Sequence, residues 1–312
     1  MVGSAPTRRS GPLRAATRGS VLARWQTDHV AGLLGVPVEP VVVETAGDRR
    51  RDLPISAIGG QGVFVKEVQA AVLSGRADFA VHSAKDLPST PTEGLVLAAV
   101  PARSDARDAL VGSTLAALPP GATVATGAVR RRAQLAALRP DLAFAELRGN
   151  VDTRLAKAGA YGAAVVAHAA LLRLGREDAA TEVLSPALML PQVAQGALAV
   201  ECRAGDEDTA LRLATVEHRE SRVAVDAERA FLAALGGGCD LPVGALAVVG
   251  RDGVLELEGL LATMDGRVVL RHRLAGQDPL ALGTALAVHL LDHAGGRRLL
   301  EDLGRSPASR GT

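Results

Sequence analysis

Short apolar runs alternate with segments of helical period along most of this chain. Residues 13–17 and 38–44 predict strands, and the helical pattern between them ends at Gly35, a residue type that commonly ends helices. A second set of the same kind begins near Asp108. Strands that alternate with helices indicate a parallel-rich sheet covered by helices. The other strands predicted in these two sets are residues 79–81, 109–111, 124–126, 145–147 and 163–167, and the helices are residues 20–34, 63–73, 130–138 and 151–158.

The pattern changes after Pro191. A predicted strand at 197–201 and a helix at 206–214 are placed to rejoin the first set by a second crossing, and two crossings between two α/β units make a hinge. From Glu217 a long helix runs to the glycines at 236–238, and strands with alternating apolar residues follow. These later elements are the strands 243–249, 254–261 and 267–274, the helix 279–291 and a polar, frayed tail at 304–312.

The expected fold class is therefore α/β: two α/β domains joined by a hinge, followed by a small α+β domain. We expect the first domain to comprise residues 1–102 together with 192–216, and the second to comprise residues 103–191. The C-terminal α+β domain would then comprise residues 217–312.

Composition narrows the class of protein. Of the 312 residues 48% are hydrophobic, and 35 basic residues face 34 acidic ones, so a general nucleic-acid binder is disfavoured. Only 2% of the residues are aromatic, which leaves few side chains on which the bases of single-stranded nucleic acid could stack. No run approaches the ~20 apolar residues that cross a bilayer. The arginine-rich N-terminus superficially resembles a targeting leader, but it has no apolar stretch of about 7 residues.

Two cysteines, Cys202 and Cys239, are too few for a disulfide framework, which favours a reducing, cytoplasmic compartment. Their spacing offers no metal-binding pair, and we interpret the three histidines near the predicted strands as structural, so no metal is expected. These histidines are His29, His82 and His168.

Cationic side chains follow several predicted strands at the point where each strand ends. Helix N-termini with unpaired N–H groups also lie at that edge of an open α/β sheet, which makes it a ligand-binding edge. Because guanidinium forks pair two-pronged with carboxylate or phosphate, the pattern predicts a cleft for a ligand with many negative charges. The residues at these ends are Arg18 and Ser20, then Ser83, Lys85 and Asp86, then Arg130 and Arg131, then Arg148, with Arg154 one helical turn beyond Asn150.

Each of these signals also has an ordinary structural interpretation. Arginines on helices are usually solvated, and Asp86 in Asp-Leu-Pro is typical of a turn. Cys239 by itself is more typical of a small buried side chain than of a nucleophile. The glycine loop around Gln61 lacks the ending of a P-loop. The prediction of an anion-binding cleft therefore depends on the repeated placement of cationic side chains at the ends of strands.

Six blocks, taken in this order and spacing, resemble the porphobilinogen deaminase (hydroxymethylbilane synthase) family. The resemblance runs from about Leu13 to Leu291, and its two longest blocks, residues 80–88 and 147–154, together are highly specific. The blocks are Thr17-Arg18-Gly19-Ser20, Gly62-Val63-Phe64-Val65-Lys66-Glu67, Ala80-Val81-His82-Ser83-Ala84-Lys85-Asp86-Leu87-Pro88, Leu147-Arg148-Gly149-Asn150-Val151-Asp152-Thr153-Arg154, Gln195-Gly196-Ala197 and Gly237-Gly238-Cys239.

The resemblance implies a fold and a reaction. The first two domains would resemble a type II periplasmic binding protein with a hinge, and the third would carry the cofactor cysteine. Four porphobilinogen molecules would be joined head to tail with loss of ammonia, and water would release hydroxymethylbilane. A dipyrromethane cofactor, held by a thioether to Cys239, would prime the chain. The resemblance also implies a cytoplasmic monomer with porphobilinogen as its substrate, and it leaves open transfer of the product to uroporphyrinogen-III synthase.

By the same resemblance, Asp86 is the catalytic carboxylate. Acetate and propionate groups on every pyrrole require many cationic donors, and arginine supplies them at any pH. Phe64 would stack on a pyrrole. The implied cofactor ligands are Ser83, Lys85, Arg130, Arg131, Arg148 and Arg154, and the implied substrate ligands are Arg18, Ser20, Phe64, Arg148, Arg154 and Arg173.

Several residues depart from the family pattern. Asp240 places a carboxylate next to Cys239, which would raise the pKa of the thiol if the two groups are close. The departures leave a slow paralogue open, and a non-catalytic two-lobed anion binder or sensor is the alternative from another class. The other departures are Val21 for proline, Gln61 for lysine, Gly127 and Ala128 for hydroxyl residues, and Ala194 for glycine.

Overall fold

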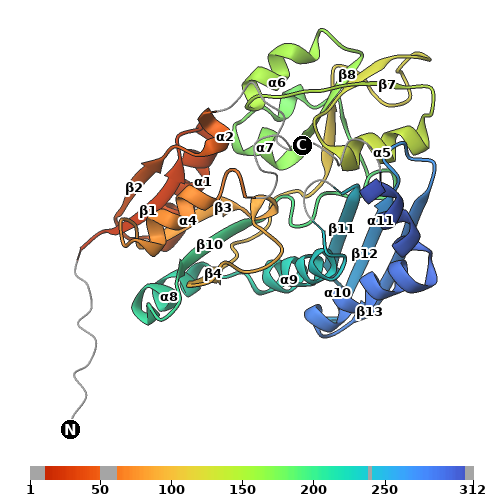
Figure 1. The fold of residues 1–312 in the computed structure, drawn as a ribbon. Coiled ribbons are helices and arrows are strands. Elements are labelled where there is room, and N and C mark those ends of the chain that lie inside the picture. Colours follow the sequence, from red (N-terminus) through yellow and green to blue (C-terminus); the bar gives the residue numbers. More distant parts are fainter. Residues whose placement is uncertain (1–10, 50–61, 238–240, 306–312) are drawn as a thin grey trace.

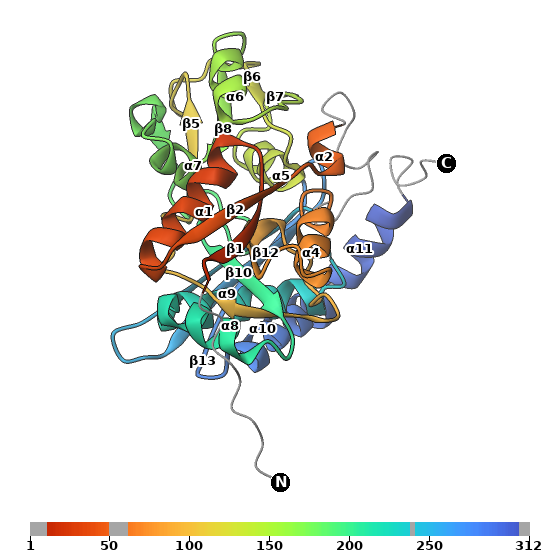
Figure 2. The same ribbon diagram turned by 90° about the vertical axis from the view of Figure 1, so that its left-hand side faces the viewer.

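The computed structural model describes residues 11–49, 62–237 and 241–305 (Figure 1). Within these ranges the chain forms two five-stranded sheets and one three-stranded sheet. Figure 2 shows the second five-stranded sheet above the first, with the helices of residues 219–234 and 279–288 below it. Among the described residues, no helix is long and apolar enough to span a membrane.

The first lobe is built on a sheet with the strand order β2-β1-β3-β10-β4. β1 pairs in parallel with β2 and β3, whereas β10 is antiparallel to both β3 and β4. Helix α1 begins where the Ser20 side chain accepts a hydrogen bond from Ala23 N, and it ends at Gly35 with a left-handed φ of 63°. The strands are β1 (Leu13–Arg18), β2 (Val38–Val43), β3 (Phe79–Ser83), β4 (Leu95–Ala99) and β10 (Leu198–Arg203), and the helices are α1 (Val21–Leu34), α2 (Ala46–Arg49), α4 (Lys66–Leu73), η1 (Ala84–Asp86), α8 (Glu207–Leu213) and η3 (Ala214–Val216).

The second lobe repeats this plan with the strand order β7-β6-β8-β5-β9. β6 pairs in parallel with β7 and β8, and β5 is antiparallel to β8 and β9. Asn150 caps α6 by accepting from Thr153 N at 2.9 Å. The strands are β5 (Asp108–Val111), β6 (Thr123–Ala125), β7 (Ala143–Ala145), β8 (Ala163–Ala167) and β9 (Glu182–Val183), and the helices are α5 (Val129–Leu138), α6 (Val151–Ala158), α7 (His168–Arg173) and η2 (Glu177–Ala179).

The chain crosses between the lobes twice, once between β4 and β5 and once between β9 and β10. One strand of each sheet therefore runs against its neighbours, and the carboxyl ends of β1, β3, β6 and β7 belong to two sheets that face each other (Figure 1). This is the two-lobed architecture of type II periplasmic binding proteins, as the sequence predicted. The residue numbers at which one domain ends and the next begins stay a prediction.

The C-terminal part is an antiparallel sheet covered by helices, the α+β unit expected from the sequence (Figure 1). Phe231 is fully buried and belongs to one apolar cluster with Leu257 and Leu286, which also includes Leu87 and Val100 of the first lobe. The elements are α9 (Arg219–Ala234), β11 (Val243–Val249), β12 (Leu255–Ala262), β13 (Val269–Gly276), α10 (Pro279–Val288), the π-helical turn η4 (His289–His293) and α11 (Gly296–Arg305).

Several predicted boundaries were wrong, for example the helix expected at 279–291, which ends at Val288 before a π-helical turn, and the strand expected at 267–274, which runs from Val269 to Gly276. The strand expected at 145–147 ends at Ala145, because Leu147 packs in the core of the lobe instead of continuing the ladder. The helix expected from residue 63 begins at Lys66, after turn residues. Residues 304 and 305, expected to belong to a frayed tail, lie instead at the end of helix α11, and the rest of the predicted tail lies outside the described residues.

Candidate active site

Lys85 and Asp86 lie on the 3-10 turn η1 that follows β3, at the edge of the first sheet that faces the second lobe. The Lys85 ammonium donates to Gln195 Oε1 at 3.2 Å. The Asp86 carboxylate makes no hydrogen bond to another described residue. Burial and neighbouring positive charges lower the pKa of both Lys85 and Arg154, and the negative charge of Asp86 opposes this effect at both residues. The carboxylate is therefore within electrostatic reach of cations from both lobes.

Arg148 and Arg154 approach from the second lobe. Arg148 follows β7, and its Nη1 atom is buried without a hydrogen-bond partner among the described residues. Arg154 lies in the first turn of α6, where its Nε donates to the carbonyl of Gly149 at 2.9 Å. Neither guanidinium forms a salt bridge with a described carboxylate, so both have donors to offer to a ligand.

The positive charges in this cleft repel one another, and this repulsion destabilises the charged forms of Lys85 and Arg154. Burial and the charge of Arg131 lower the pKa of Lys85 to about 8. Burial, Arg131 and Arg148 likewise lower the pKa of Arg154 to about 10. Cations with lowered pKa values gain free energy when an anion arrives, because it compensates their mutual repulsion. The arrangement is therefore suited to binding a ligand rich in carboxylates.

Arg130 and Arg131 lie beneath this cleft and are already paired. Both are buried, and both donate to Asp108, the fully buried first residue of β5, with three of the N···O distances between 2.8 and 3.0 Å. Burial alone would raise the pKa of Asp108, but the two arginines together with Gln195 hold it well below its usual range. Each arginine therefore retains only its remaining donors for a ligand.

Arg173 lies on α7, with its guanidinium 6.0 Å from the ring centre of Trp25 on α1. Its Nη2 donates to the carbonyl of Gly196 at 2.6 Å. The side chain is buried, which lowers its pKa to about 10, and it forms no salt bridge with a described carboxylate. Arg173 is a further cation that lacks a counter-charge where the two lobes meet.

The predicted residues of the first lobe other than Lys85 and Asp86 are engaged locally. Arg18 pairs with Asp48 at 2.5 and 3.1 Å, and its guanidinium lies 4.1 Å from the ring centre of Phe64. Ser83 Oγ accepts from Gln26 at 2.8 Å. The Ser20 hydroxyl caps α1. Any ligand contact by Arg18 or Ser20 would have to share or replace these bonds.

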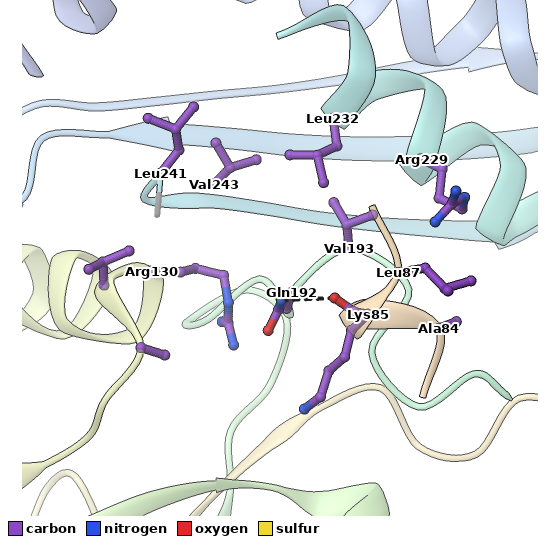
Figure 3. A pocket seen from close by; sticks show the side chains of 12 residues that line it. Ala84, Lys85, Leu87, Arg130, Gln192, Val193, Arg229, Leu232, Leu241 and Val243 are labelled. Atoms are coloured by element: carbon purple, nitrogen blue, oxygen red, sulfur yellow. Dashed lines mark hydrogen bonds between the residues drawn. The ribbon is translucent and has the colours of Figure 1, made fainter. Parts of the chain in front are cut away.

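A small cavity of about 40 Å³ lies where the two lobes meet the C-terminal domain (Figure 3). Figure 3 shows the charged ends of Lys85 and Arg130 extending to one side, opposite the apolar side chains of Leu232, Leu241 and Val243. Cys239 lies outside the described residues, as do Gln61 and Asp240. Of the described residues nearest to Cys239 in the sequence, Leu241 lines the cavity, and the carbonyl of Gly237 accepts from Ser89 Oγ at 3.4 Å.

Cys202 is the described cysteine, and it is chemically unreactive where it lies. It is fully buried on β10, and burial raises the pKa of its thiol to about 11. A thiol with this pKa is protonated at neutral pH and is a poor nucleophile.

Sequence reasoning gave no role to three buried or half-buried polar residues that organise the site, namely Asp48, Asp108 and Gln195. Asp48 pairs with Arg18, and Asp108 pairs with the two arginines. Gln195 lies within one of the family blocks, but its side chain had no predicted contact. The available signal for Asp108 was a charged residue placed directly before an apolar run.

The family models and the curated relatives agree on one family. Residues 13–211 match the family model described as porphobilinogen deaminase, dipyromethane cofactor binding domain. Residues 223–292 match the model of the porphobilinogen deaminase C-terminal domain.

Curated relatives cover nearly the whole chain. A porphobilinogen deaminase of Roseiflexus castenholzii is 50% identical over 299 residues, which are 92% of this chain and 98% of that protein. One from Nitratidesulfovibrio vulgaris (Miyazaki F) is 45% identical, over 94% of this chain and 98% of that protein. A solved periplasmic solute-binding protein from Roseobacter denitrificans is 13% identical with a TM-score of 0.36, over 66% of this chain and 78% of that chain. The fold class rests on the strand orders rather than on this last similarity.

Proposed function

Because the chain belongs to the porphobilinogen deaminase family, we propose that its interlobe cations bind the carboxylates of porphobilinogen and of a dipyrromethane cofactor, with Asp86 as the catalytic group. The chain is a transferase, a hydroxymethylbilane synthase of tetrapyrrole and heme biosynthesis. It joins four porphobilinogen molecules head to tail with loss of ammonia. The comparisons support this activity and not the alternative of a non-catalytic anion binder.

One observation carries the assignment of the site. Lys85, Arg148, Arg154 and Arg173 come from both lobes, and none of them forms a salt bridge with a described carboxylate. Buried or half-buried cations without counter-charges are costly unless a ligand supplies the anions. Acetate and propionate groups on successive pyrrole rings are anions of this kind, and arginine forks match their geometry.

The residues present fit a dipyrromethane. Its four carboxylates match the cations that lack a counter-charge, and the buried, unpartnered Nη1 of Arg148 is a donor of the required kind. When bound, this group supplies the pyrrole carbon to which the first substrate unit is joined. Lys85, Arg148 and Arg154 would hold its carboxylates, with remaining donors of Arg130 and Arg131 beside them and Ser83 as a hydroxyl ligand. Arg148 and Arg154 would also bind substrate carboxylates, together with Arg173, and Arg18 and Ser20 would do so by sharing or replacing their present bonds.

Asp86 performs the charge chemistry of the reaction. Its carboxylate is within electrostatic reach of two cations and makes no hydrogen bond to another described residue, so it is available to accept from a pyrrole N–H. Departure of ammonia leaves positive charge on the substrate ring, and a fixed carboxylate beside the ring stabilises that charge. The same group guides the proton on the departing amine. Phe64, held against Arg18, offers a ring for stacking.

We propose Cys239 as the attachment site of the cofactor. Cys202 is buried and its raised pKa keeps it protonated, which leaves Cys239 as the cysteine suited to forming a thioether. Of the described residues nearest to Cys239 in the sequence, Gly237 accepts a hydrogen bond from the Ser89 hydroxyl, and Leu241 lines the cavity beside Lys85.

Asp86→Asn tests the catalytic role. We expect kcat for ammonia release from porphobilinogen to fall about 100-fold or more, since an amide stabilises no positive charge. Asp152→Asn is the matched control, because Asp152 is half-exposed on α6 and pairs with Arg176 at 3.2 Å. Equal kcat values for wild type and Asp86→Asn, with folding intact, would remove Asp86 from the mechanism.

Further proposals concern assembly and partners. We propose that the protein acts as a monomer and that its product passes to uroporphyrinogen-III synthase. We also propose that it works in the cytoplasm, since its few cysteines fit a reducing compartment. Light scattering at working concentration tests the first of these, since a mass near 32.0 kDa identifies a monomer.

A further inference from the structure

We propose that Gln195 is a positioning residue that holds the Lys85 ammonium in the cleft as an uncompensated charge and ties it to Asp108 of the second lobe. Gln195 lies on the second crossing between the lobes and is fully buried. The proposal rests on the proposed function in one respect, namely that Lys85 binds ligand carboxylates.

The orientation of the Gln195 amide is fixed by its surroundings. Its Nε2 donates to the carbonyl of Ala106 at 2.8 Å and to Asp108 Oδ1 at 2.9 Å, with the carbonyl of Arg107 at 3.4 Å. All three partners are acceptors, so the NH₂ group must face them. The carbonyl oxygen of the amide then faces Lys85, whose Nζ donates to it at 3.2 Å.

The backbone around Gln195 prevents the side chain from withdrawing. Arg103 Nε donates to the Gln195 carbonyl at 2.8 Å, and Ser104 N donates to the Gly196 carbonyl at 3.1 Å. Gly196 has a φ of +86°, and a Cβ on it would lie 2.5 Å from Ser104 O, so a residue other than glycine does not fit. The two crossings are thereby locked together at the position of Gln195.

A neutral amide at position 195 has a different effect on Lys85 from that of a carboxylate. A carboxylate here would neutralise Lys85 in an internal ion pair and compete with a ligand carboxylate. An amide oxygen orients the ammonium and leaves its charge in place. The charged groups that act on Lys85 are Arg131, Asp86, Asp108 and Arg154, and Gln195 also contacts the Asp108 that holds Arg131.

The chain offers a convenient test, because it contains three lysines, Lys66, Lys85 and Lys157. Trace acetylation of the full chain at a series of pH values, read by peptide mass spectrometry, gives a protonation midpoint for each lysine. The Cys239→Ser background keeps the cofactor off the protein, and Lys66 and Lys157 serve as internal references. The expected midpoint of Lys85 in this background is about 8.

Two substitutions should move the Lys85 midpoint in opposite directions. Gln195→Glu should raise it by at least about tenfold in proton affinity, because a carboxylate replaces a neutral acceptor. Gln195→Met, similar in length and apolar, should lower it, because the ammonium loses its acceptor while Arg131 keeps its charge. The midpoints of Lys66 and Lys157 should stay constant in both, and Gln195→Met serves alone if Gln195→Glu does not fold.

An unchanged Lys85 midpoint in the folded variants would overturn the proposal, since a purely structural Gln195 would affect stability alone. The measurement needs no substrate, so it fails or succeeds independently of the catalytic assignment. An unchanged Lys85 midpoint would thus refute the role of Gln195, whereas absence of turnover in the wild type would refute the proposed function.

Discussion

The guanidinium of Arg103 makes a bidentate pair with the carboxylate of Glu228, with distances of 2.6 Å from Nη1 to Oε1 and 3.1 Å from Nη2 to Oε2. Arg103 lies on the first crossing between the lobes, and Glu228 is fully buried on α9 of the C-terminal domain. The same carboxylate accepts from Ala194 N on the second crossing at 2.6 Å and from Ala247 N on β11 at 2.9 Å. One buried anion thus joins both crossings to the C-terminal domain.

Replacing Glu228 should destabilise the whole molecule. In Glu228→Gln the Arg103 guanidinium keeps its charge without a counter-ion, and an amide cannot accept through both of its ends. We expect the free energy of unfolding in urea to fall by about 3 to 5 kcal/mol. Glu256→Gln is the control, because Glu256 is more than half exposed and pairs with Arg273 at 3.4 Å, so it should change little. Equal losses in the two variants would contradict this account.

Replacing Asp108 should lower the free energy of unfolding, because this carboxylate pairs with two buried arginines. Asp108→Asn leaves two buried arginines sharing one neutral side chain, and we expect a loss of about 3 to 5 kcal/mol in urea unfolding. Asp141→Asn removes a two-pronged surface partner of Arg139 and should have a far smaller effect. A stable Asp108→Asn variant would show that the arginines do not depend on this carboxylate.

Arg154 should contribute to affinity for the substrate. Its guanidinium has no salt-bridge partner among the described residues, so Arg154→Gln removes a donor meant for a ligand rather than a structural bond. We expect KM for porphobilinogen to rise about tenfold or more, the usual effect of losing a charged hydrogen bond. The exposed Arg132, replaced by Gln, provides the comparison. Matching KM values in the two variants would take Arg154 out of the binding site.

Binding should weaken as pH rises through about 8, the pKa to which burial and Arg131 lower Lys85. Below this pH the folded protein carries the ammonium that a carboxylate needs, and above it the amine is neutral. The Kd of the cofactor-free Cys239→Ser protein for porphobilinogen, measured on both sides of pH 8, should therefore rise on the alkaline side. Lys85→Arg should remove that dependence, because arginine stays charged. A dependence that persists in Lys85→Arg would assign the titration to another group.

The sequence predicted the architecture well, and the reason is local. Apolar runs, caps such as Ser20 and stops such as Gly35 lie within a few residues of what they determine. The placement of cations after strands also predicted a site between the lobes. In the structure the charge of Asp86 acts on both Lys85 and Arg154, and the roles of these residues stay a prediction. Helix α11 was not predicted, since residues 296–305 follow a helix that was expected to end the fold and carry three arginines.

Pairings across the chain were beyond such reasoning. The partner of Arg130 and Arg131 is 22 and 23 residues away, and no periodicity connects Asp108 to them. Gln195 is further still, 110 residues from Lys85. Ala194, where the family often has glycine, adopts a left-handed φ of 59°, which explains the family preference at that position.

The intact mass of the purified protein under denaturing conditions tests the central claim most directly. We predict that wild type and Cys202→Ser both carry the added mass of a dipyrromethane, and that Cys239→Ser carries none. That result would establish the cofactor and its attachment at Cys239 in one measurement. A wild type that stays at its bare polypeptide mass after incubation with porphobilinogen, or an adduct retained by Cys239→Ser, would contradict the account.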